Sequence, residues 1–340
     1  MNGVGIDLGT ANTVVYRPRR GVVTDEPSVM VVRSSTSVKR IRPLMVGQEA
    51  KALTGRCPAG LVVVRPLQDG VIIDLELARA YLRSVRQMFG QLWPRVHPVS
   101  VIGVPAGATP LERRALVEAA EEAGLKRVRL VPEPIAGALG CGLNPLQARA
   151  HMVVDVGGGT SEVTALCFGG ILTHRSCRMA GDEMTLALYQ YLRAEHQLIV
   201  GELTAERVKC QLAVEENFSL TAQGLDAATG RPRLVTLGVG ELLDALRPTV
   251  DTIIATLANS LEDLPPQAVD DILEEGVWAF GGGVMLRGFD KLLEDALGFS
   301  IRVADRPLLC VAEGAAACID HPEVLDAFDG KLVSFAEASS

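Results

Sequence analysis

Apolar and polar residues alternate along the chain in a pattern that predicts strands and helices in turn. Thr109-Pro110-Leu111-Glu112 is typical of a helix start, because it combines an N-cap Thr, Pro at the first helical position and Glu at the third. This helix is expected to end at Gly124. The first half further predicts strands at residues 4–8, 13–16, 22–23, 29–32, 99–104 and 128–131, and helices at 77–89 and 135–142.

The second half of the chain continues in the same style. Apolar residues within 241–261 recur at helical spacing and predict a long helix. The remaining predictions are strands at 152–156, 162–167, 278–280 and 300–303, and helices at 183–194, 205–213, 288–297 and 312–319. Alternating strands and helices of this kind predict an α/β protein.

One short motif occurs twice. Residues 6–10 read Ile-Asp-Leu-Gly-Thr, and residues 154–160 read Val-Asp-Val-Gly-Gly-Gly-Thr. The two aspartates, Asp7 and Asp155, are about one domain length apart, so the repeat predicts two similarly built lobes that face each other.

Composition narrows the possible functions. The chain has 33 basic and 41 acidic residues, a formal net charge of −8, and only 4% aromatic residues. This balance disfavours a nucleic-acid partner, since such proteins usually carry a basic surplus and aromatic stacking surfaces.

No run approaches the roughly 18 apolar residues that a membrane span requires. The N-terminus meets a carboxylate at Asp7, and no signal peptide is expected. Seven cysteines without a Cys-x-x-Cys pair predict reduced thiols in the cytoplasm and no zinc site.

The repeated motif offers a phosphate-binding chemistry. Glycine after a buried strand lets backbone N–H groups point at an anion, and the preceding aspartates supply charge for a hydrated Mg²⁺. A single Asp-x-Gly-Thr is more often an ordinary turn, but two copies and a third glycine run at 281–283 favour the phosphate interpretation. Neither a P-loop nor a Rossmann glycine motif is present.

Two further features leave alternatives open. Glu133 stands between two prolines directly after a predicted strand, where a carboxylate can orient an attacking water. It can equally be an exposed Glu in a rigid turn. Thr204 is the expected N-cap of a helix that places Glu206 and Lys209 on one face. This pair can contact a nucleoside, or it can be an ordinary surface ion pair.

Taken together, these residues resemble the bacterial actin homologues of the MreB type, within the actin/Hsp70/sugar-kinase superfamily. The resemblance covers residues 3 to about 320, in order. Its matching stretches are 6–13, 26–29, 65–72, 101–105, 133–134, 153–163, 180–184, 204–209, 281–283 and 286–288.

The resemblance implies an actin-like ATPase fold, with two lobes built on duplicated ribonuclease-H-like cores and four subdomains. The implied subdomains are IA (1–32, 66–140 and 310–340), IB (33–65), IIA (141–181 and 246–309) and IIB (182–245). ATP or ADP and Mg²⁺ are expected between the lobes.

The resemblance also implies roles for single residues. Asp7 and Asp155 are expected to hold the metal through water, and Glu133 to position the hydrolytic water. The nucleotide-binding residues implied for the phosphates are Thr10, Ala11, Asn12, Gly157, Gly158, Gly159, Thr160 and Gly181. Those implied for the nucleoside and adenine are Glu206, Lys209, Gly281, Gly282, Gly283, Val284 and Met285.

Members of the resembled family polymerise into paired protofilaments on the inner face of the cytoplasmic membrane, where they act with membrane proteins of the cell-wall elongation machinery. Leu92 and Trp93 match the lipid-binding loop, and Leu and Trp beside an Arg suit the headgroup boundary. Alternatively, Trp93 packs under its own loop. The segment 209–224 is shorter than is usual in the family, which puts the lateral filament contacts in doubt.

Three other functions are considered. A specialised actin-like filament that positions organelles or plasmids is compatible with the short segment. An Hsp70-like chaperone is disfavoured because no substrate-binding domain follows the predicted ATPase core. A sugar kinase is disfavoured because it would need a base for a sugar hydroxyl and usually has larger lobes.

Overall fold

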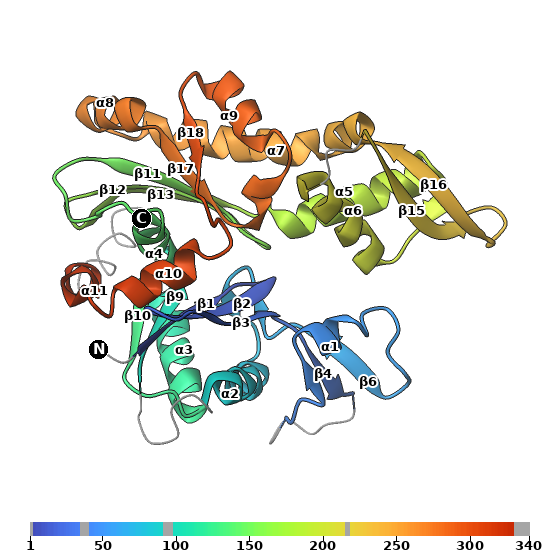
Figure 1. The fold of residues 1–340 in the computed structure, drawn as a ribbon, viewed down its shortest axis with the longest axis horizontal. Helices are drawn as coiled ribbons and strands as arrows, with labels where there is room; N and C mark the ends of the chain where they lie inside the picture. The colour runs from blue at the N-terminus through green and yellow to red at the C-terminus, as the bar shows by residue number, and fades with distance from the viewer. Residues whose placement is uncertain (1–2, 35–40, 91–97, 215–217, 330–340) are drawn as a thin grey trace.

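The computed structural model describes residues 3–34, 41–90, 98–214 and 218–329, which form two lobes (Figure 1). Lobe I contains a five-stranded sheet in the order β10-β9-β1-β2-β3. Its strands are β1 (Gly3–Leu8), β2 (Asn12–Arg17), β3 (Gly21–Pro27), β9 (Val99–Val104) and β10 (Val128–Pro132).

Lobe II repeats this sheet in the order β13-β12-β11-β17-β18. In each lobe the first three strands are antiparallel neighbours, and the last two run parallel to the first. The predicted duplication is confirmed. The lobe II strands are β11 (His151–Val156), β12 (Ser161–Cys167), β13 (Gly170–Cys177), β17 (Val277–Phe280) and β18 (Ile301–Val303).

A small sheet extends each lobe on the same side of the molecule (Figure 1). Beside lobe I it consists of β4 (Met30–Arg33), β5 (Met45–Val46) and β6 (Leu61–Val64), followed by the pair β7 (Leu67–Gln68) and β8 (Val71–Ile72). Beside lobe II it consists of β14 (Leu198–Ile199), β15 (Ser219–Asp226) and β16 (Pro232–Gly238). The residue limits of the four subdomains stay a prediction.

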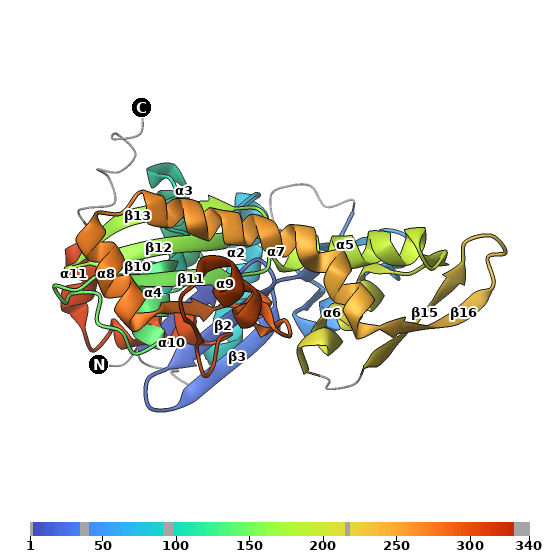
Figure 2. The same cartoon turned by 90° about the horizontal axis from the view of Figure 1, so that it is seen from above.

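Helices cover the sheets and separate the lobes. In lobe I these are α1 (Gln48–Lys51), α2 (Leu75–Gly90), α3 (Pro110–Glu122) and α11 (Pro322–Asp329). In lobe II they are α5 (Gly181–Ala194), α6 (Glu202–Val214), α7 (Val239–Glu262), α8 (Pro266–Glu275), η1 (Gly282–Met285) and α9 (Phe289–Leu297). Figure 2 shows α7 running along lobe II toward the β15–β16 hairpin. None of the helices in the described segments has the length and apolarity needed to cross a bilayer.

Two helices, α4 (Glu133–Gly140) and α10 (Cys310–Ala317), lie between the two main sheets (Figure 1). They cross at very close range: a Cβ added to Gly314 would lie 1.7 Å from the carbonyl oxygen of Ala136. Only glycine allows this approach. Around the crossing, a core that includes Val101, Ile135 and Phe280 is shared by both lobes.

Local chemistry explains where several elements begin. The predicted capping box is present, because the Thr109 side chain accepts from the Glu112 N–H and the Glu112 carboxylate accepts from the Thr109 N–H. Six helices begin two or three residues before their predicted starts, which are α2, α4, α5, α6, α7 and α10, and two of these differences concern the site. Helix α4 begins at Glu133 rather than residue 135, directly after β10. Helix α6 begins at Glu202, and the N–H of Thr204 donates to the carbonyl of Gly201, so Thr204 lies in the first turn and is not the N-cap.

Candidate nucleotide site between the lobes

The two copies of the repeated motif occupy equivalent places in the two lobes. Asp7 and Asp155 are each the second-to-last residue of the central strand, β1 or β11. Each strand ends in a glycine turn, which we call the first phosphate turn (residues 9–12) and the second phosphate turn (residues 157–160). The turns meet across the gap between the lobes. A Cβ on Gly158 would lie only 2.8 Å from Ala11 Cβ, so this approach requires glycine.

A cavity of about 400 Å³ separates the lobes at this point and is lined by both turns. Its volume falls within the range of small-molecule sites. The predicted site residues that line it are Asp7, Thr10, Ala11, Asn12, Glu133, Asp155, Gly157, Gly158, Gly159, Thr160, Gly181, Glu206, Lys209, Gly281, Gly282, Gly283 and Met285. Val284 is placed elsewhere, because its side chain is buried in the core of lobe II. Leu92 and Trp93 lie outside the described residues.

Carboxyl groups gather at the floor of this cavity. Burial raises the pKa of Asp7 to about 7, with a further contribution from Asp25. Burial also raises the pKa values of Glu133 and Asp155 well above their usual range, and neighbouring carboxylates add to both shifts. The alternative of an exposed Glu133 in a turn is wrong, since this residue opens α4 and lines the cavity.

The sequence interpretation gave no role to Glu162, a fourth acid in this group. Glu162 is 6% exposed on β12, directly opposite Asp155, and burial raises its pKa to about 7. Among the described residues its Oε2 atom has no hydrogen-bond partner. A carboxylate inside an apolar strand, next to a motif already singled out, is the signal that could have identified it.

The acid group fits a hydrated divalent cation. Buried like charges raise one another's pKa values, and a cation in their midst relieves that repulsion. Within the described segments, no three His, Cys, Asp or Glu side chains are close enough together to enclose an ion. Mg²⁺ suits such a place, because it keeps several waters and takes one or two carboxylates with phosphate oxygens.

Helix α6 forms the opposite wall of the cavity. The Lys209 ammonium donates to the carbonyl of Gly181 at 2.6 Å, and burial lowers the pKa of Lys209. Glu206 pairs with Lys51 of lobe I at 2.8 Å, so its salt-bridge partner comes from the other lobe. The sequence interpretation also missed several apolar and weakly polar residues of this part of the cavity, which are Cys210, Ala213, Val214, Pro307 and Leu308.

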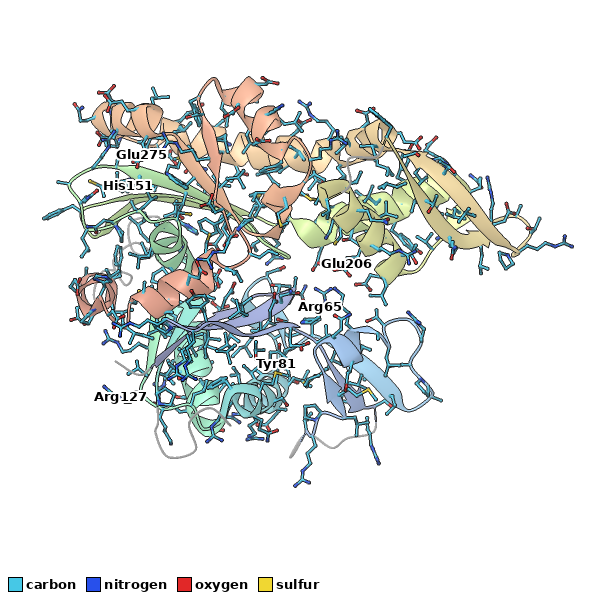
Figure 3. The ribbon with its side chains drawn as sticks, in the orientation of Figure 1. Arg65, Tyr81, Arg127, His151, Glu206 and Glu275 are labelled. Carbon is cyan, nitrogen blue, oxygen red and sulfur yellow. The ribbon has the colours of Figure 1, made fainter. Side chains whose placement is uncertain are left out.

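Ion pairs connect the lobes beside the cavity. Arg65 pairs with Asp182 at 2.9 Å and with Glu202 at 3.5 Å. Figure 3 shows Arg65 and Glu206 on opposite sides of the gap between the lobes. Because all these pairs remain partly exposed, each is expected to contribute modestly to stability.

Two lobes of equal strand order, with opposed glycine turns and an acid group between them, define a protein with the actin-like fold. The family model for MreB/Mbl protein matches residues 1–327, and the chain therefore belongs to this family. It is 37% identical to the cell shape-determining protein MreB of Escherichia coli strain K12, over 98% of this chain and 96% of that protein. It is 36% identical to the cell shape-determining protein Mbl of Bacillus subtilis strain 168, over 95% and 97%.

A solved structure agrees with this assignment. The crystal structure of MreB5 of Spiroplasma citri bound to ADP superposes with a TM-score of 0.87 at 30% identity, and covers 94% of this chain and 96% of that one. The same protein bound to AMPPNP gives a TM-score of 0.86.

Proposed function

We propose that this chain binds ATP with Mg²⁺ between its lobes, hydrolyses it slowly and polymerises into filaments at the cytoplasmic membrane. The observation that carries the proposal is the pair of phosphate turns in contact across a cavity that is lined by Asp7, Glu133 and Asp155, with Glu162 buried beside Asp155. The adenine nucleotides bound by MreB5 of Spiroplasma citri support the choice of ligand.

Each wall of the cavity has a proposed part in binding. Backbone N–H groups of the two turns hold the phosphates, which is the usual chemistry of such turns. Glu206 and Lys209 contact the nucleoside, and Gly281–Met285 pack beside the adenine, with Val284 supporting this segment from the core. Mg²⁺, held through water by Asp7 and Asp155, supplies charge neutralisation for the transferred phosphoryl group.

Glu133 is proposed to orient the attacking water. It opens α4 directly after β10 and lines the cavity together with Asp7 and Asp155. In phosphoryl transfer a protein mainly positions the reactants and stabilises charge, so a single aimed carboxylate is sufficient for this task.

Filament formation is proposed from family membership. A head-to-tail contact that does not close on itself gives an open polymer, and closure of the two lobes on a nucleotide can create or strengthen it. The relatives named cell shape-determining support a role in organising wall synthesis and rod shape, together with membrane proteins of the elongation machinery.

Sedimentation tests the assembly. With ATP and Mg²⁺ at micromolar protein concentration, and with liposomes present, the protein is expected to pellet and to form paired protofilaments in electron micrographs. EDTA in place of Mg²⁺ is the control. A protein that binds ATP but stays monomeric under all these conditions would contradict the filament proposal while leaving the nucleotide site intact.

Membrane contact is proposed for Leu92 and Trp93, on the sequence evidence alone. Replacing both with Ser is expected to abolish co-sedimentation with liposomes, because the apolar area inserted at the headgroup boundary is lost. Nucleotide binding, measured in parallel, should not change. Undiminished lipid binding would direct attention to another surface.

A further inference from the structure

Ser28, the residue after β3, contacts the first phosphate turn from the side that faces away from the cavity. Its backbone N–H donates to the carbonyl oxygen of Ala11 at 2.8 Å, and its Oγ donates to the carbonyl oxygen of Gly9 at 2.6 Å. Ser28 is fully buried, and it does not belong to the cavity lining. One residue therefore holds two of the carbonyl groups of this turn.

These two contacts determine where the amides of the turn point. In a trans peptide the C=O of one residue and the N–H of the next point in opposite directions. With the carbonyls of Gly9 and Ala11 directed at Ser28, the N–H groups of Thr10 and Asn12 point away from it. Thr10 and Asn12 line the cavity, so these N–H groups face the space proposed for the phosphates.

The Ser28 hydroxyl is itself fixed by a buried chain of hydrogen bonds. The Tyr81 hydroxyl, on α2, donates to Thr13 Oγ1 at 2.9 Å, and Thr13 Oγ1 lies 2.9 Å from Ser28 Oγ. Each hydroxyl has one proton. Since the Ser28 proton is donated to Gly9, Thr13 must donate to Ser28 and accept from Tyr81. The carbonyl oxygen of Pro27, at 3.5 Å, is a second and longer acceptor for the Tyr81 hydroxyl.

Lobe II holds its own turn by the same principle. The N–H of Gly181 donates to the carbonyl of Gly157 at 3.1 Å, and the N–H of Asp182 donates to the carbonyl of Gly158 at 2.7 Å. Gly181 and Asp182 follow β13, which occupies the place in lobe II that β3 occupies in lobe I. Both lobes thus hold turn carbonyls through the residues that follow the third antiparallel strand, with a helix start in lobe II and with Ser28 in lobe I. Gly181 and Asp182 line the cavity, whereas Ser28 does not.

We propose that Ser28 is a positioning residue for nucleotide binding, which keeps the N–H groups of Thr10 and Asn12 directed at the polyphosphate. The proposal rests on the nucleotide-binding function proposed above. N–H groups that already point at the binding space need no free energy to reorient when the anion binds. A small displacement of the contact that holds them is therefore enough to weaken binding.

The test is the affinity for ADP of the full-length protein, measured by calorimetry. Ser28→Ala removes the hydroxyl and is expected to weaken ADP binding about tenfold, the usual scale for one lost hydrogen bond. Ser100→Ala is the matched control, because Ser100 is equally buried in the sheet of lobe I and its hydroxyl has no partner among the described residues. This control should bind ADP like the wild type.

Tyr81→Phe separates positioning from general stability. It removes a buried hydrogen bond of the same chain but leaves both contacts between Ser28 and the turn. It is expected to lower the unfolding midpoint in urea while ADP affinity stays unchanged. If folded Ser28→Ala binds ADP as tightly as wild type, or if Tyr81→Phe loses as much affinity as Ser28→Ala, the proposal is overturned.

A measurement on the wild type covers the case in which Ser28→Ala does not fold. In a protein labelled with ¹⁵N, inorganic pyrophosphate is expected to shift the amide resonances of Thr10 and Asn12. If pyrophosphate binds and these resonances stay in place, the assigned direction of the two N–H groups is wrong. A wild type that binds neither ADP nor pyrophosphate would instead reject the nucleotide-binding function itself.

Discussion

Replacing Asp7 with Asn is expected to stabilise the nucleotide-free protein above neutral pH. The folded protein raises the pKa of Asp7 from 3.8 to about 7, chiefly by burial and secondly through the charge of Asp25. A shift of this size corresponds to about 4 kcal/mol of unfavourable free energy for the ionised group, at roughly 1.4 kcal/mol per pKa unit. This is an upper value, because neighbouring acids share the repulsion.

The sign of the effect follows from proton binding. Below pH 4 both the folded and the unfolded states keep the proton, and the substitution has little effect. Between pH 4 and 7 the unfolded state loses the proton first, so the stability of the wild type falls as the pH rises. Above pH 7 the folded protein carries the full cost, which the neutral Asn side chain avoids.

Urea unfolding in EDTA at pH 5 and at pH 8 measures this difference. The free energy of unfolding of Asp7→Asn should exceed that of the wild type mainly at pH 8. When Mg²⁺ and ADP are added instead of EDTA, they should stabilise Asp7→Asn less than they stabilise the wild type. Asp295→Asn, which replaces an exposed carboxylate on α9, is the control and should change neither value. An Asp7→Asn protein that is less stable than wild type at pH 8 would refute the reasoning.

Three further substitutions test other parts of the molecule. Glu133→Ala is expected to slow phosphate release at least tenfold with little change in nucleotide affinity, since it removes the group that aims the water; unchanged hydrolysis would exclude this role. Lys51→Met leaves Glu206 without its partner across the gap and should speed ADP dissociation a few-fold in a stopped-flow assay; an unchanged rate would show that the pair does not restrain release. Thr109→Ala removes the cap of α3 and should cost about 1 kcal/mol in urea unfolding, with ADP affinity unaffected; no loss of stability would argue against the cap.

The sequence was most informative where local chemistry and tertiary structure agree. The capping box at Thr109 and Glu112 needs only residues that are close in the chain, and it starts α3 as predicted. The apolar runs around Asp7 and Asp155 become the central strands of their sheets, because a run buried on both faces has few other places in a fold. The equal strand order of the two lobes follows from that repeat.

Elements with weak or contradictory local signals escaped the sequence analysis. Helix α8 starts at Pro266 after a second proline, and such a pair usually indicates a loop. Proline at the first helical position is tolerated, because the N–H that it lacks would have no partner in the helix. The β15–β16 hairpin alternates buried and exposed positions, but its exposed face carries Leu225 and Leu234 and its buried face is interrupted by Gly224, which blurs the alternation in the sequence. The sequence analysis also missed β13, α11, η1 and several short elements, which are α1, β5, β6, β7, β8 and β14.

The features of the site that could not be predicted from the sequence are contacts between residues that are far apart in the chain. Lys51 and Glu206 are 155 positions apart, so no local pattern indicates that they pair. Glu206 and Lys209 share a helix, yet Glu206 pairs with the other lobe and Lys209 with a backbone carbonyl. Ser28 appears in the chain as an ordinary serine after proline, and only the fold brings it behind the first phosphate turn.

The crossing of α4 and α10 has a consequence for how the molecule can deform. At Gly314 the backbone of α10 meets the backbone of α4 at Ala136, with no side chain of Gly314 between them. A small rotation about this contact would displace the small sheets more than the helices themselves, because the small sheets lie farther from the crossing point (Figure 1). A Cβ atom at Gly314 would force α4 and α10 apart. The resulting change in the angle between the lobes would displace most the parts of each lobe that lie farthest from this crossing.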